Sequence, residues 1–182
     1  MKHTKQLVLS AVFAALTAAS AFLRIPAGGT YVTLPVLFVV LSGMLLGPGW
    51  GAMSQLVYVA LGLLGLPIFT EGGGLSYVLK PTFGFLLSYI PAAFLVGLIV
   101  QKWGSALWKL LLAGLAGVVV IYAVALPYVY IIQNLYLGSP LPVDKLMMGY
   151  CVIFLPFDAA KVLAAALLSA RLLPIVRKLG KF

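Results

Sequence analysis

Acidic residues are nearly absent from this sequence: only three of its 182 residues are Asp or Glu. Three carboxylates cannot supply the acidic clusters with which metal-dependent membrane transferases hold their ions. Histidine and cysteine are scarcer still, with one each, His3 and Cys151. A histidine at the chain end cannot complete a Ser-His-Asp triad, and one cysteine excludes an intramolecular disulfide and a multi-thiolate metal site. We therefore expect neither an enzyme nor a protein that holds a metal or another cofactor.

Long polar stretches are missing as well. Hydrophobic residues make up 64% of the chain and charged residues 8%, and the mean hydropathy is +1.18. A soluble globule of this composition could not keep its apolar surface out of water, so the composition predicts an integral membrane protein. The sequence also contains no GxxxxGK[ST] stretch, the phosphate-binding loop of many ATPases. Any transport by this chain must therefore draw its energy from a partner or from an ion gradient.

Six apolar runs have about the length of a membrane-spanning helix, which needs about 20 residues. They occupy residues 7–23, 32–46, 52–66, 82–100, 107–132 and 146–173. The second and third runs are short, at about 15 residues each. We expect an all-α, polytopic membrane protein of the bacterial or archaeal cell membrane, built as a compact bundle of six transmembrane helices. The bundle forms a single domain over residues 1–182.

Basic residues are distributed unevenly between the two sides of such a bundle. One side carries eight of them: Lys2, Lys5, Lys102, Lys109, Arg171, Arg177, Lys178 and Lys181. The other side carries three: Arg24, Lys80 and Lys145. Because cytoplasmic loops hold the excess of Lys and Arg, both termini are expected in the cytoplasm, and the positive charge reflects topology rather than nucleic-acid binding. The first run also resembles a signal peptide, but its removal would spoil this balance, so we expect it to be retained.

Two opposite charges, Asp158 and Lys161, interrupt the apolar stretch LPFDAAKVLAAALLSA. A charge near the centre of a membrane helix costs on the order of 3 kcal/mol, so such residues usually face a cavity or a partner. At this spacing the two side chains project from one face of a helix. Together they can hold a ligand that carries an anionic group and hydrogen-bond donors. The alternative is that they only neutralise each other as a buried link between helices.

The longest external connection, residues 67–80, carries three consecutive glycines together with Glu71, Tyr77 and Lys80. Glycines allow backbone conformations that other residues avoid, so this loop can fold tightly or move. We expect it on the outer side, where it acts either as a lid or as an ordinary solvated loop.

Small residues recur at four-residue spacing in the first run, where Ala11, Ala15 and Ala19 form one stripe and Ala14 and Ala18 another. Such stripes let helices approach closely. They serve either a partner in the membrane or packing within the bundle.

Four stretches of the chain closely resemble the BioY family. They read VTLPVLFVVLSGMLLGP (32–48), GAMSQLVYVALGLLGLPIF (51–69), GGG…KPTFGFLLSYIPAAFLVG (72–97) and LPFDAAKVLAAALLSARL (155–172). Members of that family are six-helix, substrate-binding S components of energy-coupling-factor (ECF) transporters that take up biotin. The resemblance implies that Asp158 and Lys161 contribute to the ligand pocket. It also implies that Ala11 and Ala15 dock onto a transmembrane coupling subunit, which works with two ABC-type ATPases.

A biotin pocket needs an acceptor for the ureido N–H groups, an apolar or aromatic wall and a cation for the carboxylate. We expect Asp158 to be the acceptor, and Lys161 or Lys80 to be the cation. Tyr58, Tyr77, Phe83 and Phe85 are expected to line the middle. Gln55 either contacts the ligand or bonds another helix.

The segment KPTFGFL, with Lys80, Phe83 and Phe85, departs from the usual family pattern, and so does Pro35. The ligand is therefore expected to be biotin or a related small carboxylate. A self-sufficient secondary carrier for such a ligand, driven by an ion gradient, is the second function that the sequence leaves open.

Overall fold

The structure is a computed structural model that describes residues 2–27 and 30–179, so that Lys181 of the predicted topology lies outside the described residues. The described chain is mostly helical. Its long helices are α1 (Lys2–Ala21), α2 (Pro35–Leu63), α3 (Phe83–Trp103), α4 (Leu107–Ile131) and α6 (Leu155–Leu179). Within the described residues, five helical stretches are long and apolar enough to cross a membrane. The mostly helical, multi-pass class expected from the sequence is therefore confirmed, and the count of six helices is not.

Most of the second and of the third apolar run falls within the single helix α2. Gly47 interrupts α2 with a non-helical backbone (φ 79°, ψ −177°), and Pro48 follows it. A glycine tolerates this positive φ, and proline suits the first turn of a new helix because that turn does not use its N–H. Backbone hydrogen bonding thus continues across a break in direction.

The two halves of α2 lean against each other on either side of this break. The amide nitrogen of Gln55 lies 3.1 Å from the hydroxyl of Ser42, although residues 13 apart in a straight helix are separated by about 20 Å. A Cβ added at Gly51 would lie 2.9 Å from the Cα of Gly43. Gly43 and Gly51 therefore allow the two halves to touch, and each half packs as a helix of its own.

Helix α3 packs directly on the break. A Cβ added at Gly97 would lie 2.5 Å from the carbonyl carbon of Gly47 and 2.5 Å from the nitrogen of Pro48, and one added at Gly43 would lie 2.5 Å from the carbonyl oxygen of Ala93. Small residues at such crossings let helix backbones approach closely. The α2 break is thus fixed by backbone contact with a neighbouring helix.

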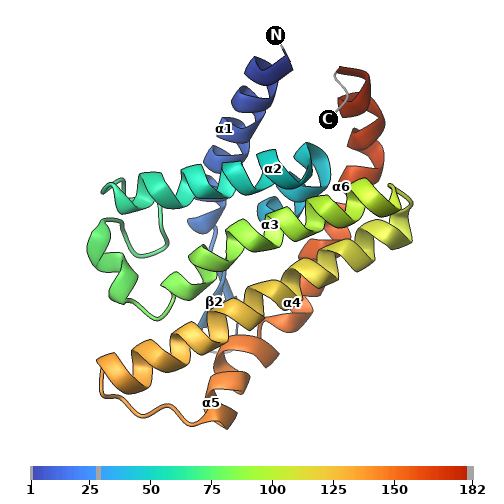
Figure 1. The fold of residues 1–182 in the computed structure, drawn as a ribbon. Coiled ribbons are helices and arrows are strands. Elements are labelled where there is room, and N and C mark those ends of the chain that lie inside the picture. The colour runs from blue at the N-terminus through green and yellow to red at the C-terminus, as the bar shows by residue number, and fades with distance from the viewer. Residues whose placement is uncertain (1, 28–29, 180–182) are drawn as a thin grey trace.

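Short elements connect the long helices. They are the antiparallel strands β1 (Ile25–Ala27) and β2 (Thr30–Val32), the 3₁₀-helix η1 (Leu75–Leu79), the π-helical turns η2 (Ile132–Tyr136) and η3 (Met148–Val152), and α5 (Val143–Met147). The sequence analysis did not anticipate the hairpin, because three-residue strands are too short to show an alternating pattern. Helix α1 begins and helix α6 ends at the same end of the bundle (Figure 1).

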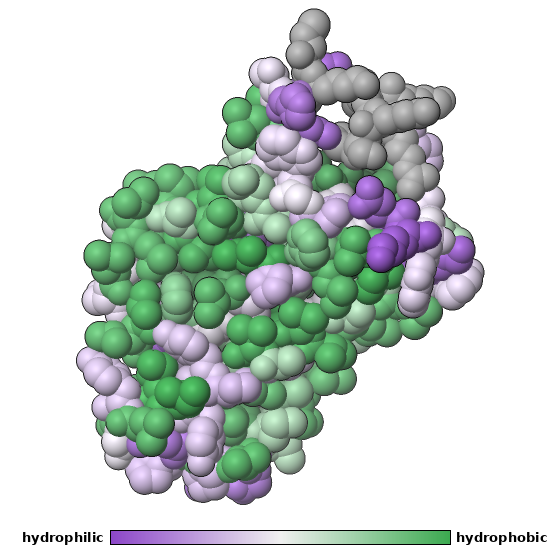
Figure 2. All heavy atoms as spheres, in the orientation of Figure 1, coloured by the Kyte–Doolittle hydropathy of each residue, from purple (hydrophilic) through white to green (hydrophobic). Residues whose placement is uncertain are grey.

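The core lies where α2, α3, α4 and α6 meet. Large side chains without exposure there include Val40, Val96, Leu110 and Val162. The outer surface is apolar as well: hydrophobic residues cover most of the face seen in Figure 2, and hydrophilic residues gather towards its two ends. Such a distribution is expected of a protein whose middle is surrounded by hydrocarbon.

Candidate functional site

The predicted pair Asp158 and Lys161 is formed and buried. Asp158 lies in the first turn of α6, and Lys161 follows one turn later. The ammonium of Lys161 lies 2.7 Å from Oδ1 of Asp158, and the two residues are 4% and 7% exposed. Two opposite charges this close satisfy each other in a medium where neither could be left unpaired.

Tyr122 on α4 completes the polar centre, although no sequence pattern singled it out. Its hydroxyl donates a hydrogen bond to Oδ2 of Asp158, so each carboxylate oxygen receives a proton donor from the protein. Tyr122 is itself buried. In the sequence it stands within the apolar run VVVIYAVAL, where an aromatic residue indicates core packing. Its phenolic hydroxyl is the only signal of a polar role.

Aromatic rings from α2, the following loop and η1 form a cluster beside this centre. Tyr58 meets Phe69 edge-on with ring centroids 5.5 Å apart, and Phe69 meets Tyr77 at 4.7 Å. Tyr89 on α3 lies within electrostatic range of Tyr58, Tyr77 and Asp158. The structure thus brings the predicted residues Tyr58 and Tyr77 together around Phe69, and Tyr89, which no sequence pattern singled out, lies in the same region.

Phe83 and Phe85 lie at the start of α3 and pack against different tyrosines of α4. Phe85 meets Tyr122 edge-on at 6.3 Å, next to the hydroxyl that holds Asp158. Phe83 meets Tyr128 at 5.9 Å, and the Tyr128 hydroxyl donates to the carbonyl of Val78. Of the two phenylalanines, Phe85 is therefore the one that touches the tyrosine bound to Asp158.

Lys80 lies outside the buried centre. Its ammonium is 2.9 Å from a carboxylate oxygen of Glu71, and both side chains are about half exposed. The same ammonium lies 4.9 Å from the centroid of the Tyr77 ring, within the range of a cation–π contact. Lys80 thus marks the solvent-exposed rim of the aromatic cluster.

The loop that carries Lys80 is tied to Arg24, the residue just before β1. The guanidinium of Arg24 donates to the carbonyl of Thr70, and Phe69 and Gly72 exchange backbone hydrogen bonds. These bonds order the connection predicted as either a lid or a solvated loop. Its role as a lid stays a prediction.

Gln55 is fully buried and bonds within α2. Its amide nitrogen donates to the hydroxyls of Ser42 and Ser54, and both serines donate in turn to backbone carbonyls. The Gln55 amide therefore connects the two halves of α2, as the helix-bonding alternative requires. Its carbonyl oxygen has no hydrogen-bond partner among the described residues, so a ligand contact stays a prediction for that atom alone.

The two alanine stripes of α1 face different ways. Ala11, Ala15 and Ala19 are exposed, whereas Ala14 is buried and Ala18 is half-buried. The inner stripe packs within the bundle. The outer stripe leaves small residues exposed on α1, and docking there stays a prediction.

Comparison with known proteins shows the family. The BioY family profile matches residues 1–178. The chain is 42% identical over 177 residues to the probable biotin transporter BioY of Lysinibacillus sphaericus, covering 97% of this chain and 90% of that protein. It is 36% identical over 169 residues to the biotin transporter BioY of Thermotoga maritima, covering 92% of this chain and 95% of that protein.

A solved structure agrees with these relatives. The crystal structure of an S-component for biotin from an ECF-type ABC transporter matches with a TM-score of 0.80 and 27% identity, covering 98% of this chain and 94% of that one. Sequence and fold therefore agree over nearly the whole length, and the chain belongs to the BioY family.

Proposed function

We propose that this chain is the high-affinity, biotin-binding S component of an ECF-type vitamin uptake transporter. The observation that carries the proposal is the buried pair Asp158 and Lys161, held by Tyr122 and flanked by the cluster Tyr58, Phe69 and Tyr77. It offers an acceptor, a cation and an aromatic wall, which are the parts that biotin requires. The relatives named as biotin transporters and the solved S-component for biotin support the same ligand.

In this proposal Asp158 accepts hydrogen bonds from the ureido N–H groups of biotin. Each carboxylate oxygen has two acceptor positions, of which one is used by Lys161 or by Tyr122. A second donor from the ligand can therefore bind without displacing the first. The protein donors hold the carboxylate in place before the ligand arrives.

The same geometry favours Lys80 as the partner of the ligand carboxylate. Biotin carries its carboxylate at the end of a valerate chain, well away from the ureido ring. Lys161 lies 2.7 Å from Asp158, so one ligand cannot place both its ends there. Lys80 lies instead at the exposed end of the aromatic cluster, over Tyr77. An extended ligand between Asp158 and Lys80 would run along the rings of Tyr77 and Tyr89.

We further infer six membrane segments, with the two halves of α2 as the second and third. An even number of segments accounts for the shared position of the start of α1 and the end of α6 (Figure 1). The eight-to-three distribution of basic residues supports a cytoplasmic location for both ends.

Transport in this proposal requires a transmembrane coupling subunit and two ABC-type ATPases. The outer alanine stripe of α1, with Ala11 and Ala15, is the surface for the coupling subunit. Close approach of two helices needs small residues of this kind. The lack of a phosphate-binding loop in the sequence is consistent with an external source of energy.

The decisive experiment separates binding from transport. The detergent-purified chain should bind biotin without ATP, and more tightly than desthiobiotin or a dicarboxylate precursor. Reconstituted vesicles should accumulate biotin only when the coupling subunit, both ATPases and ATP are present. Rapid uptake by the chain alone, driven by an ion gradient, would establish the secondary carrier instead.

A further inference from the structure

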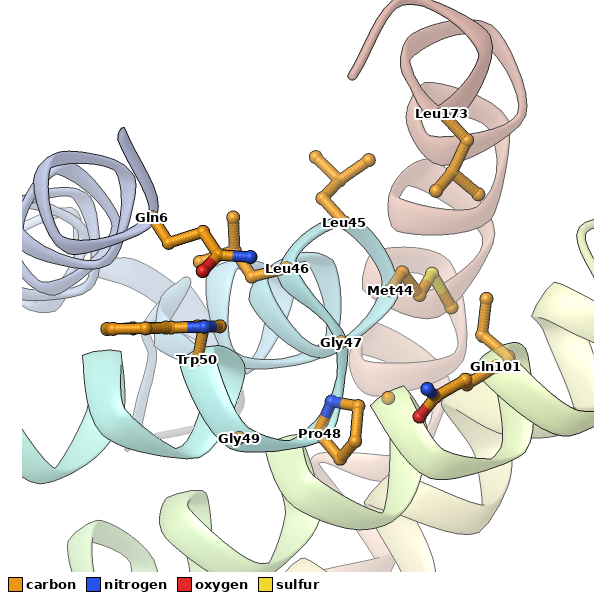
Figure 3. Close-up of a pocket in the computed structure, with 12 residues that line it drawn as sticks. Gln6, Met44, Leu45, Leu46, Gly47, Pro48, Gly49, Trp50, Gln101 and Leu173 are labelled. Atoms are coloured by element: carbon orange, nitrogen blue, oxygen red, sulfur yellow. The ribbon is translucent and has the colours of Figure 1, made fainter. Parts of the chain in front are cut away.

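A hollow in the molecule lies at the α2 break, away from the polar centre. It is a cavity of about 560 Å³ between α1, the break, α3 and α6, within the roughly 300–1,000 Å³ of small-molecule sites. Its walls are mostly apolar and include Leu45, Leu46, Trp50 and Leu173, with Gln6 and Gln101 as polar lining residues (Figure 3). Neither Asp158 nor Lys161 lines it. The ligand pocket proposed above does not account for this cavity.

The cavity lies towards the end of the bundle where α1 begins and α6 ends, since Gln6 lines it from the start of α1 and Leu173 from the later part of α6. Basic residues lie in the same part of these helices. The ring of His3 lies 6.4 Å from the ring of the lining residue Trp50. Lys5 and Lys102 are exposed, and each is adjacent in the chain to one of the two lining glutamines. A lysine can carry its ammonium several ångströms along an apolar surface, which is the reach that binding at this cavity requires of both.

Negative charge is absent from this end of the described chain. The three acidic residues of the sequence lie in the loop after α2, in α5 and at the start of α6: Glu71, Asp144 and Asp158. An anion at this end would therefore meet cations and amide groups without a competing carboxylate. An apolar wall beneath a cationic rim is complementary to an amphiphile with a negative head group.

We propose that this cavity binds one anionic phospholipid of the cytoplasmic leaflet. An acyl chain lies against Leu46 and Trp50, and the phosphate lies among His3, Lys5 and Lys102. Basic pockets between membrane helices on the cytoplasmic side are suited to lipid phosphate groups. Because residues 44–50 form one wall, the bound lipid also supports the α2 break. This proposal does not depend on the identity of the transported ligand.

The test compares two lipids that differ in head-group charge. The purified chain, without coupling subunit, is heated in mixed micelles with phosphatidylglycerol or with phosphatidylcholine at equal mole fraction. We expect phosphatidylglycerol to raise the melting temperature by about 5 °C more than phosphatidylcholine when it is present well above its Kd. Native mass spectrometry of the same samples should retain one phosphatidylglycerol per chain. Equal effects of the two lipids would overturn the proposal.

A cavity-filling variant locates the lipid. Gly49 lines the cavity, its backbone is not in the left-handed region, and a Cβ added there meets nothing within 4 Å. Gly49→Phe places a bulky ring at the cavity wall from a position where the first side-chain carbon has open space, and it should abolish the retained phosphatidylglycerol. Gly149→Phe is the matched control, since a Cβ at Gly149 also has open space and this residue lies in η3, outside the cavity. Equal lipid retention in both variants would overturn the proposed place.

A charge variant tests the binding of the lipid head group if Gly49→Phe fails to fold. Lys5→Gln combined with Lys102→Gln alters two exposed side chains and should remove the preference for phosphatidylglycerol over phosphatidylcholine. Lys145→Gln, at an exposed position of α5, should keep that preference. A full preference in the double variant would mean that the rim does not bind the head group, and the proposal would be wrong.

Discussion

The hydroxyl of Tyr122 on α4 binds the carboxylate of Asp158 on α6, across 36 residues of sequence. Lys161 neutralises the same carboxylate from its own helix. Asp158 is therefore fixed by two donors of different kinds, one neutral and one charged. A buried carboxylate with this support keeps its orientation when no ligand is bound.

The first prediction concerns Tyr122. Tyr122→Phe keeps the aromatic ring and removes the hydroxyl that donates to Asp158. Because the carboxylate is then held less firmly, biotin affinity should fall roughly tenfold, about 1.4 kcal/mol. Titration calorimetry of the purified variant measures the change. Tyr130→Phe on the same helix is the control, because Tyr130 is 41% exposed, and it should bind biotin as the wild type does. An unchanged affinity in Tyr122→Phe would show that this hydrogen bond is not used for binding.

The second prediction separates ligand binding from mutual neutralisation. Asp158→Asn should weaken biotin binding by about 1.5–3 kcal/mol, since it loses a charge-assisted acceptor. If the pair only links parts of the bundle, each single change leaves a partner as an unpaired buried charge and lowers the melting temperature. The double variant Asp158→Asn with Lys161→Met would then regain stability and bind normally. We expect the double variant to regain stability but not affinity; recovered biotin binding would refute the ligand contact.

The third prediction tests Lys80, at the exposed end of the aromatic cluster. Lys80→Gln should weaken binding of free biotin by up to about 1 kcal/mol, since exposed ion pairs contribute little more than that. A biotin amide has no charge to lose, so its affinity should change less. Glu71→Gln is the matched control: it frees Lys80 from its ion pair and should leave biotin binding equal or tighter. Equal loss for biotin and its amide in Lys80→Gln would assign the carboxylate to another cation.

The fourth prediction concerns the crossing of α3 over the α2 break. Gly97→Ala should destabilise the protein by about 1–3 kcal/mol, because the new methyl group meets backbone atoms that cannot move aside cheaply. Thermal unfolding of the purified chain measures the effect. Gly49→Ala, where a Cβ has open space, should unfold within about 0.5 kcal/mol of the wild type. Similar stability of the two variants would mean that α3 can shift away from the break.

The fifth prediction concerns the outer alanine stripe. Ala11→Trp with Ala15→Trp should abolish co-purification with the coupling subunit, because bulky side chains prevent close approach. Biotin binding by the isolated variant should stay near the wild-type value. The control is Leu115→Trp with Val119→Trp, two exposed positions at the same spacing on α4, which should still co-purify. Loss of biotin binding with an intact complex would assign the stripe to the bundle interior.

Local patterns in the sequence predicted much of this structure. The pair Asp158 and Lys161 follows from helical spacing alone, because residues three apart on one helix share a face. The same periodicity separated the alanines of the first run into two stripes, but it did not say which stripe is exposed and which is buried. Hydropathy located the apolar runs, since each run has to match the thickness of a membrane.

Contacts between distant segments could not be predicted in this way. Tyr122 and Asp158 meet only because α4 and α6 pack side by side, and one sequence does not state which helices are neighbours. The same limit applies to Phe83 and Phe85, which are two residues apart and pack on different tyrosines. The fold-back of α2 had a local signal, Gly47 followed by Pro48, but contact between Gly43 and Gly51 depends on the angle of that turn.

The break at Gly47 also bears on how the chain enters a bilayer. The halves of α2 on either side of it, residues 35–46 and 48–63, rise only about 18 and 24 Å. The hydrocarbon core is about 30 Å thick, so each half spans it only together with the turns that flank it. We expect the two halves to partition together during biosynthesis, as a helical hairpin that the hydrogen bond between Gln55 and Ser42 closes from within. Insertion of this part of the protein would then be a single cooperative event.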